Sequence, residues 1–178
     1  LVLTNLQRWR LAFAHVVAAT RQAMLYVGDG SNAATGEWLP LWEAILDGRP
    51  YLIRLHPHML AVDGDNEAHV DYVHELFEHL ATVARPVLLA SGPSTGRLHL
   101  FCRLSDDAIR TETVIRAKAR QLDVRQFIRP PLSPHRAGGL SFPIEPGDWR
   151  VALAALVSSH RPHRPLSAAM GNILRNGD

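Results

Sequence analysis

The chain has 178 residues and a formal net charge of +2, with 47% hydrophobic and 20% charged residues. These values predict one globular domain, or one domain with a short appendage, that has enough apolar material for a sizeable core. The single cysteine, Cys102, excludes an internal disulfide and a cysteine-based zinc ribbon, and no apolar run reaches the ~18 residues that a membrane span requires. The expected location is the cytoplasm, with no membrane partner.

Apolar spacing in the N-terminal part predicts two helices. The first begins near Asn5 and carries apolar residues at helical spacing as far as Met24. A second helix is predicted over Glu37–Leu46, after a polar glycine-containing loop. Its two tryptophans, Trp38 and Trp42, are interpreted as core residues, with a stacking platform as the alternative.

From residue 51 onwards the patterns indicate both strands and helices. Strands are predicted at Tyr51–Leu55, Met59–Asp63, Val87–Ala90, Arg97–Leu104, Leu122–Arg125 with a continuation at Phe127–Ile128, and Ser141–Ile144. Helices are predicted at Asn66–Val83, Ser105–Gln121 and Asp148–Val157. Neither the glycine fingerprint of dinucleotide-binding folds nor a P-loop is present, so we expect an α+β sheet with helices packed on one side.

An acidic pair ends one of these strands. The apolar run Met59–Val62 is followed by Asp63, Gly64 and Asp65. Residues two positions apart in an extended chain lie on the same face, so the two carboxylates should share one side of the sheet. Like charges this close favour a bound divalent cation, which prefers oxygen ligands. The alternative is an acidic turn, because the same residues have good turn chemistry.

A second motif follows at residues 91–101. A turn of small residues leads into a strand of alternating polar and apolar residues, with Arg97, His99, Phe101 and Arg103 on one face. Backbone amides and hydroxyls in such a turn can hold phosphate oxygens, and Arg97 adds a fixed positive charge. The alternative for His99 is a core histidine with its hydrogen bonds satisfied.

A third motif begins at Asp123 and continues through the diproline Pro130-Pro131 to Gly139. It gathers Arg129, Ser133, His135 and Arg136 around the stiff diproline. Between residues 97 and 136 there are nine basic and four acidic residues. The arginine fork suits phosphate groups, so this segment favours a rigid phosphate-facing loop. A solvated basic face is the alternative.

In their residues and order, the three motifs resemble the catalytic domain of the archaeo-eukaryotic primase superfamily, in particular the primase-polymerase domains of phages, plasmids and integrated elements. That family carries a paired acidic motif after a strand, then a small-residue turn with a strand histidine, then a third acid. In the phage and plasmid branch a Pro-Pro-Ser-x-His-like stretch often follows. The resemblance covers residues 55–144, and Leu132 departs from it by interrupting the small residues after the prolines. It implies an RRM-like mixed or antiparallel sheet with flanking helices.

The resemblance also implies an activity, namely template-directed nucleotidyl transfer by a DNA primase or DNA polymerase in replication of a phage, plasmid or integrated element. Two ions of Mg²⁺ or Mn²⁺, ~3.5–4 Å apart, would be held by Asp63, Asp65 and Asp123 as the catalytic and metal-binding residues. The expected partners are an NTP or dNTP and a single-stranded or primed DNA template. The residues expected to bind the nucleotide are Ser94 (with Ser91 as the alternative hydroxyl), Thr95, Arg97, His99, Arg129, Ser133, His135 and Arg136.

The expected catalytic domain spans residues 1–157, with an N-terminal helical part at about 1–48 and a catalytic core at about 49–157. Residues 158–178 contain Arg161-Pro162-His163-Arg164-Pro165, which has the composition of a linker. Primase-polymerases of mobile elements are often joined to a helicase, so we expect this segment to lead to a helicase domain in a longer parent protein.

Two other functions fit parts of the sequence. A replication-initiator or relaxase endonuclease of the HUH type uses a histidine pair and a tyrosine, for which His56, His58 and Tyr72 are available. Pro57 between the histidines disfavours this, because proline cannot donate to a central strand ladder. The second alternative is a non-catalytic nucleic-acid-binding module. The presence of all three acids disfavours that function.

Overall fold

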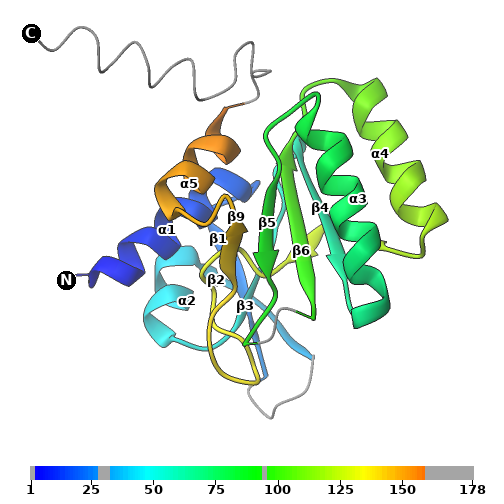
Figure 1. Ribbon diagram of the computed structural model, residues 1–178. Helices are drawn as coiled ribbons and strands as arrows, with labels where there is room; N and C mark the ends of the chain where they lie inside the picture. The colour runs from blue at the N-terminus through cyan, green and yellow to red at the C-terminus, as the bar shows by residue number, and fades with distance from the viewer. Residues whose placement is uncertain (1–2, 28–32, 94–95, 159–178) are drawn as a thin grey trace, which may run out of the picture.

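The structure is a computed structural model that describes residues 3–27, 33–93 and 96–158. The described residues form two antiparallel sheets and five α-helices, so the α+β class predicted from the sequence is confirmed. The helices are α1 (Asn5–Val17), α2 (Leu41–Asp47), α3 (Val70–Ala81), α4 (Asp107–Ala119) and α5 (Trp149–Val157), shown in Figure 1. Within the described ranges, no helix has the length and apolarity needed to cross a membrane.

The larger sheet has five strands in the order β7-β4-β6-β5-β9. They are β4 (Met59–Gly64), β5 (Val87–Ala90), β6 (Leu98–Arg103), β7 (Asp123–Val124) and β9 (Phe142–Glu145). Side chains alternate between the two faces of each strand. In β4, Leu60 and Val62 pack with apolar residues of α3 and α4, whereas Met59 and Ala61 pack in a second cluster with α1, α5 and the smaller sheet.

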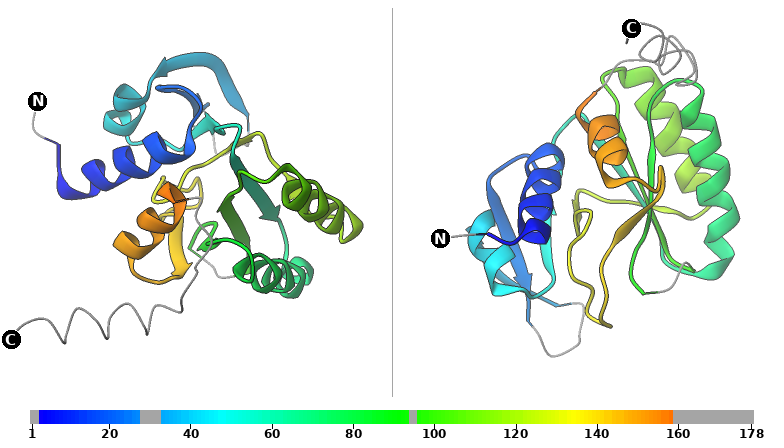
Figure 2. Two further views of the ribbon diagram at one scale, coloured as in Figure 1. Left: turned by 90° about the horizontal axis from the view of Figure 1, so that it is seen from above. Right: turned by 60° about the vertical axis from the view of Figure 1, so that its left-hand side comes forward.

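The smaller sheet has four strands in the order β2-β1-β3-β8. They are β1 (Gln22–Tyr26), β2 (Ala34–Pro40), β3 (Tyr51–Arg54) and β8 (Phe127–Ile128). Its inner face packs with the buried residues of α1 and α2 in the same cluster that includes Met59 and Ala61. In Figures 1 and 2, α3 and α4 lie on the side of the larger sheet away from the smaller one. Residues of α1 and α5 pack on its other side, so the expectation of helices on one side only was wrong.

The N-terminal part differs from the prediction of two helices. The first helix starts as expected, with Thr4 as N-cap in a capping box, but it ends at Val17. The chain then becomes extended, and Met24 lies in β1 instead of on a helix. The segment before α2 is a strand to Pro40, so the predicted start at Glu37 was wrong. The part at residues 1–48 is therefore mixed rather than helical.

Two further corrections concern single features. Trp38 and Trp42 are 37% and 50% exposed, so their assignment to the core was wrong. The strand at Asp123–Val124 and the strand at Phe127–Ile128 are not one element, because they belong to different sheets. The segment between them therefore crosses from one sheet to the other. The linker predicted at residues 158–178 lies outside the described residues except for Ser158.

Candidate functional site

Strand register brings residues of all three motifs into one row across the larger sheet. Asp63 of β4 lies directly opposite Asp123 of β7 on one side and opposite His99 of β6 on the other. Directly opposite residues in antiparallel strands point to the same face. These side chains are therefore neighbours, on the face turned away from α3 and α4.

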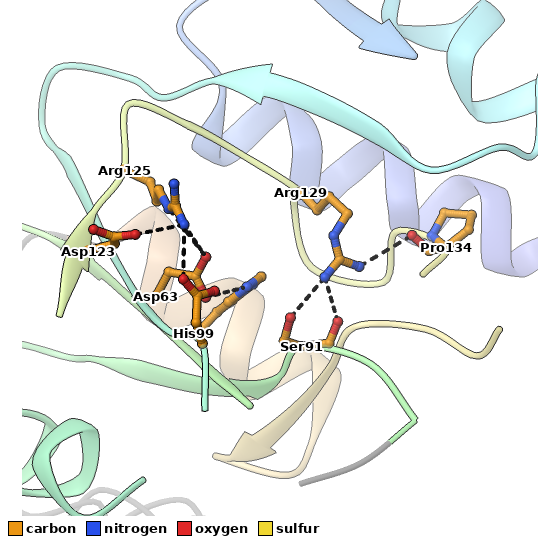
Figure 3. Close-up of polar contacts among 8 residues, drawn as sticks. Asp63, Ser91, His99, Asp123, Arg125, Arg129 and Pro134 are labelled. Carbon is orange, nitrogen blue, oxygen red and sulfur yellow. Dashed lines mark hydrogen bonds and ion pairs between the residues drawn. The ribbon is translucent and has the colours of Figure 1, made fainter. Parts of the chain in front are cut away.

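Arg125 lies at the centre of the three carboxylates, as Figure 3 shows for Asp63 and Asp123. Its Nη2 atom is 3.2 Å from Oδ2 of Asp63, 3.2 Å from Oδ2 of Asp65 and 2.8 Å from Oδ2 of Asp123. The predicted meeting of Asp63 and Asp65 on one side is therefore confirmed, and Asp123 joins them. The sequence motifs gave Arg125 no role, although its position two residues after Asp123 in an extended segment was a usable signal.

The carboxyl groups of Asp63 and Asp65 are in different electrostatic environments. Burial raises the pKa of Asp63, but the hydrogen bond and charge of His99 and the charge of Arg125 outweigh burial, and the pKa lies below its ordinary value. Burial and the neighbouring charge of Asp63 raise the pKa of Asp65, which Arg125 only partly offsets. Three carboxyl groups around one guanidinium hold an excess of negative charge, so a further cation would be stabilised there.

The carboxylates are also the ligand type that Mg²⁺ and Mn²⁺ prefer. As the side chains stand, the described part of the chain contains no group of three His, Cys, Asp or Glu residues arranged to hold a metal ion. The guanidinium of Arg125 occupies the position on which the three carboxylates converge. The donor set therefore fits a hard divalent ion, provided that Arg125 moves away. Its side chain is 39% exposed, which leaves room for such a movement.

His99 connects the acidic row to the core. It is 3% exposed, its ring packs edge-on near Phe101 with centroids 6.4 Å apart, and its Nε2 lies 3.1 Å from Oδ1 of Asp63. Its Nδ1 is buried and has no hydrogen-bond partner among the described residues. His99 is therefore as buried as a core histidine would be. It also orients the carboxylate of Asp63 in the site.

Arg129 joins two loops behind the row. Its Nη2 donates to the carbonyl oxygen of Ser91 at 2.7 Å and to the Ser91 hydroxyl at 2.8 Å, and its Nη1 donates to the carbonyl oxygen of Pro134 at 3.4 Å (Figure 3). Arg129 is 8% exposed. Because it follows β8 of the smaller sheet and Ser91 follows β5 of the larger one, this side chain ties the two sheets together. The sequence did not predict this structural role.

A cavity of about 360 Å³ opens between the two sheets at this row. Its polar lining comes from the three motifs and consists of Asp63, Asp65, Ser91, Arg97, His99, Arg125, Arg129, His135 and Arg136. Its other side comes mainly from the smaller sheet and consists of Tyr26, Pro50, Leu52, Phe127 and Ile128. The cavity therefore has a charged half and a largely apolar half, and the sequence predicted residues of the charged half only.

Five of the eight predicted nucleotide-binding residues line this cavity, namely Arg97, His99, Arg129, His135 and Arg136. Ser133 is fully buried and does not line it. Ser94 and Thr95 lie outside the described residues. Ser91, the alternative hydroxyl, does line the cavity and accepts a hydrogen bond from Arg129.

The imidazole ring of His135 packs against Gly92 in the small-residue turn. A Cβ atom added to Gly92 would lie 2.9 Å from the imidazole ring, so this position leaves no room for a side chain unless the ring moves. The ring Nδ1 accepts a hydrogen bond from the backbone N–H of Ala137 at 3.0 Å. Burial, followed by the nearby charges of Arg129 and Arg136, lowers the pKa of His135 to about 4. The imidazole is therefore neutral near pH 7.

The endonuclease alternative gains no support from the arrangement of its residues. The rings of His56 and His58 are 5.4 Å apart, but both residues lie in the turn between β3 and β4 instead of in a strand. The guanidinium carbon of Arg120 lies 4.6 Å from the centroid of the Tyr72 ring. Tyr72 and His56 line two different cavities. The histidine pair and the tyrosine therefore do not form one site.

Comparisons with known proteins found no relative of this chain. No protein-family model matches the chain, and no match is found among curated proteins or among solved structures.

Proposed function

We propose that the chain catalyses template-directed nucleotidyl transfer, as a DNA primase or DNA polymerase that depends on Mg²⁺ or Mn²⁺. The observation that carries this proposal is the convergence of Asp63, Asp65 and Asp123 on one point beside a cavity lined with arginines and histidines. A carboxylate cluster next to fixed positive charge is what a metal-bound triphosphate requires. Replication of a phage, plasmid or integrated element, and a helicase in the same parent chain, remain predictions from the motif resemblance.

The three carboxylates hold the divalent ions in this proposal. When bound, the ions lower the pKa of the attacking 3′-hydroxyl and stabilise the charge on the leaving pyrophosphate. Asp63 is the most precisely positioned of the three, because His99 contacts one of its oxygens and its side chain is only 13% exposed. Asp65 and Asp123 are 57% and 55% exposed, so they can adjust to the ligand.

The basic residues bind and position the triphosphate. Arg97 and Arg136 line the cavity near the carboxylates and supply positive charge for phosphate oxygens. Arg129 acts indirectly, because its donors already hold Ser91 and Pro134 and so keep two walls of the cavity together. Little covalent chemistry is asked of the protein, so catalysis comes from positioning and charge stabilisation.

The apolar half of the cavity accommodates the nucleobase. Leu52 and Phe127 lie on the side opposite the arginines, so a base can contact an apolar surface while its phosphates reach the positive charge. A volume of about 360 Å³ is within the usual range of ligand pockets, which begins at roughly 300 Å³. Size and polarity therefore both suit a nucleotide.

A primer-extension assay with the 178-residue chain tests the proposal. A primed oligonucleotide is offered one dNTP at a time, in Mg²⁺, in Mn²⁺ or in excess chelator. We expect extension only by the nucleotide complementary to the template, and only with a divalent ion. DNA binding without incorporation in either metal would favour the non-catalytic module. Addition of every nucleotide regardless of template would contradict template direction.

A further inference from the structure

The outer face of the smaller sheet carries large apolar side chains. Strand register places Trp38 of β2 and Leu52 of β3 directly opposite Met24 of β1, one on each side. In the next row, Arg54 of β3 lies opposite Phe127 of β8. These five residues therefore share one face. The residues that alternate with them point to the core under α1 and α2, and include Ala23, Leu25, Tyr51 and Ile53.

Two aromatic rings on this face touch each other and remain accessible. The ring centroids of Trp38 and Phe127 are 5.9 Å apart with an interplanar angle of 47°, and the residues are 37% and 43% exposed. Met24 and Leu52 beside them are partly buried. A pair of large exposed aromatics with apolar neighbours is a feature of binding surfaces, whereas single exposed apolar residues such as Trp42 are common.

The charge on this face indicates which class of ligand would bind there. Among the strand residues that the register places on this face, Arg54 is the one charged side chain, and it is exposed. An exposed aromatic pair next to an arginine matches the two features of single-stranded nucleic acid, which are bases with π-faces and phosphates with negative charge.

The face is continuous with the cavity of the candidate site. Phe127 and Leu52 line that cavity, and Trp38, which does not line it, contacts Phe127 and so extends the apolar surface beyond the cavity. A strand that paired with an incoming nucleotide in the cavity would therefore leave it across this surface.

We propose that the outer face of the smaller sheet binds the single-stranded DNA template, with bases stacked on Trp38 and Phe127 and a backbone phosphate on Arg54. This inference rests on the proposed function for the identity of the strand. The contact is sequence-tolerant, because every base offers a π-face. Arg54 adds a salt-dependent contribution through one phosphate.

The test measures binding of a fluorescent oligothymidine by anisotropy, without metal or nucleotide. Trp38→Leu and Phe127→Leu keep apolar side chains but remove the rings, and Trp42→Leu is the matched control because Trp42 is also exposed but lies on α2. We expect each of the first two variants to raise Kd about five- to tenfold, the lower part of the range for loss of one stacked base. Trp42→Leu should change Kd less than about twofold.

An oligonucleotide with abasic sites separates stacking from other causes, because it keeps the phosphates and removes the bases. The wild-type chain should bind it more weakly than oligothymidine, and Trp38→Leu should cause no further loss with this ligand. Equal losses on both ligands would overturn the inference, as would an unchanged Kd for Trp38→Leu. Self-association in sedimentation velocity that Trp38→Leu abolishes would also overturn it, by assigning the face to a second copy of the chain.

Failure of this inference is distinguishable from failure of the proposed function. If the ring variants lose oligothymidine binding but the wild-type chain incorporates no nucleotide, the face binds single-stranded DNA as inferred, but the proposed function and the identity of the strand as a template both fail. If the chain extends primers and the ring variants bind and extend like the wild type, only the inference fails.

Discussion

The two sheets of this molecule line one cavity with opposite chemistry. The larger sheet contributes Asp63 and His99 to the lining. With Asp123 they form one row across three strands, and the row continues the buried apolar face of β4. The smaller sheet contributes mainly apolar side chains, and its outer face carries the exposed pair Trp38 and Phe127. Polar groups are therefore held on a packed strand framework, while the apolar groups lie at an accessible surface.

This difference indicates that the two sheets have different roles. Charged groups that must meet at one point gain from strands whose register is fixed by packing on both faces. Apolar groups that contact bases need exposure more than exact placement, and an outer sheet face provides it. The segment at residues 123–128 and the side chain of Arg129 connect the two regions.

The largest effect on stability is expected for Arg129→Met, which removes the link between the sheets. The buried carbonyl and hydroxyl of Ser91 lose their charged partner, and we expect the free energy of unfolding to fall by about 2–4 kcal/mol. Urea denaturation measures this. Arg8→Met is the control, since Arg8 is exposed on α1, and should stay within about 0.5 kcal/mol. An equally small change for Arg129→Met would show that packing alone joins the sheets.

A smaller effect is expected for Arg125→Gln, which removes the cation among the carboxylates of the larger sheet. Because Arg125 is 39% exposed and screened by solvent, we expect a loss of about 1 kcal/mol in the metal-free protein. Mn²⁺ should then raise the melting temperature more than it does for the wild type, because no guanidinium competes for the carboxylates. Thermal unfolding with and without Mn²⁺ measures both effects. The same Mn²⁺ shift in both proteins would mean that Arg125 does not compete with the ion.

The third effect is a dependence of stability on pH that arises from His135. Its folded pKa of about 4 lies below the ordinary value of 6.5, so between these values the unfolded chain binds a proton that the folded chain does not. The free energy of unfolding should therefore rise with pH across this window and fall as pH drops from 6.5 towards 4. His135→Gln should flatten this dependence, whereas His74→Gln, at an exposed position on α3, should not. Urea denaturation between pH 4.5 and pH 7 gives the slopes, and identical slopes for His135→Gln and the wild type would contradict this origin.

The larger sheet could be predicted because its signals are local. The run Met59–Val62 is apolar and bounded by Pro57 and Gly64, and the alternation at residues 97–104 fixes which residues share a face. The spacing of Asp63 and Asp65 then predicted their common side. Arg125 received no role because its importance depends on three carboxylates from two separate motifs. The spacing within one motif does not show that these carboxylates meet.

The smaller sheet was predicted only in part. The strands β3 and β8 were expected, but β1 and β2 were not, because the signals of these two strands are non-local. Neither β1 nor β2 contains valine or isoleucine, and β2 carries Gly36 with φ +82°, so strand propensity is weak. Trp38, Leu41 and Ile45 also fit helical spacing, which extended the predicted helix backwards into a strand. These segments are strands because they pair with each other and with β3. Tertiary pairing overrides the local pattern here.

The most direct test of the central claim is the rate of single-nucleotide incorporation on a primed template in Mn²⁺. Asp63→Asn, Asp65→Asn and Asp123→Asn each remove one of the carboxylates that meet at Arg125, and Asp71→Asn is the control because Asp71 is exposed on α3. Circular dichroism verifies that each variant is folded. We expect incorporation at the wild-type rate in Asp71→Asn and none above background in the other three variants. Wild-type incorporation by any of those three would contradict the assignment of the metal-dependent site.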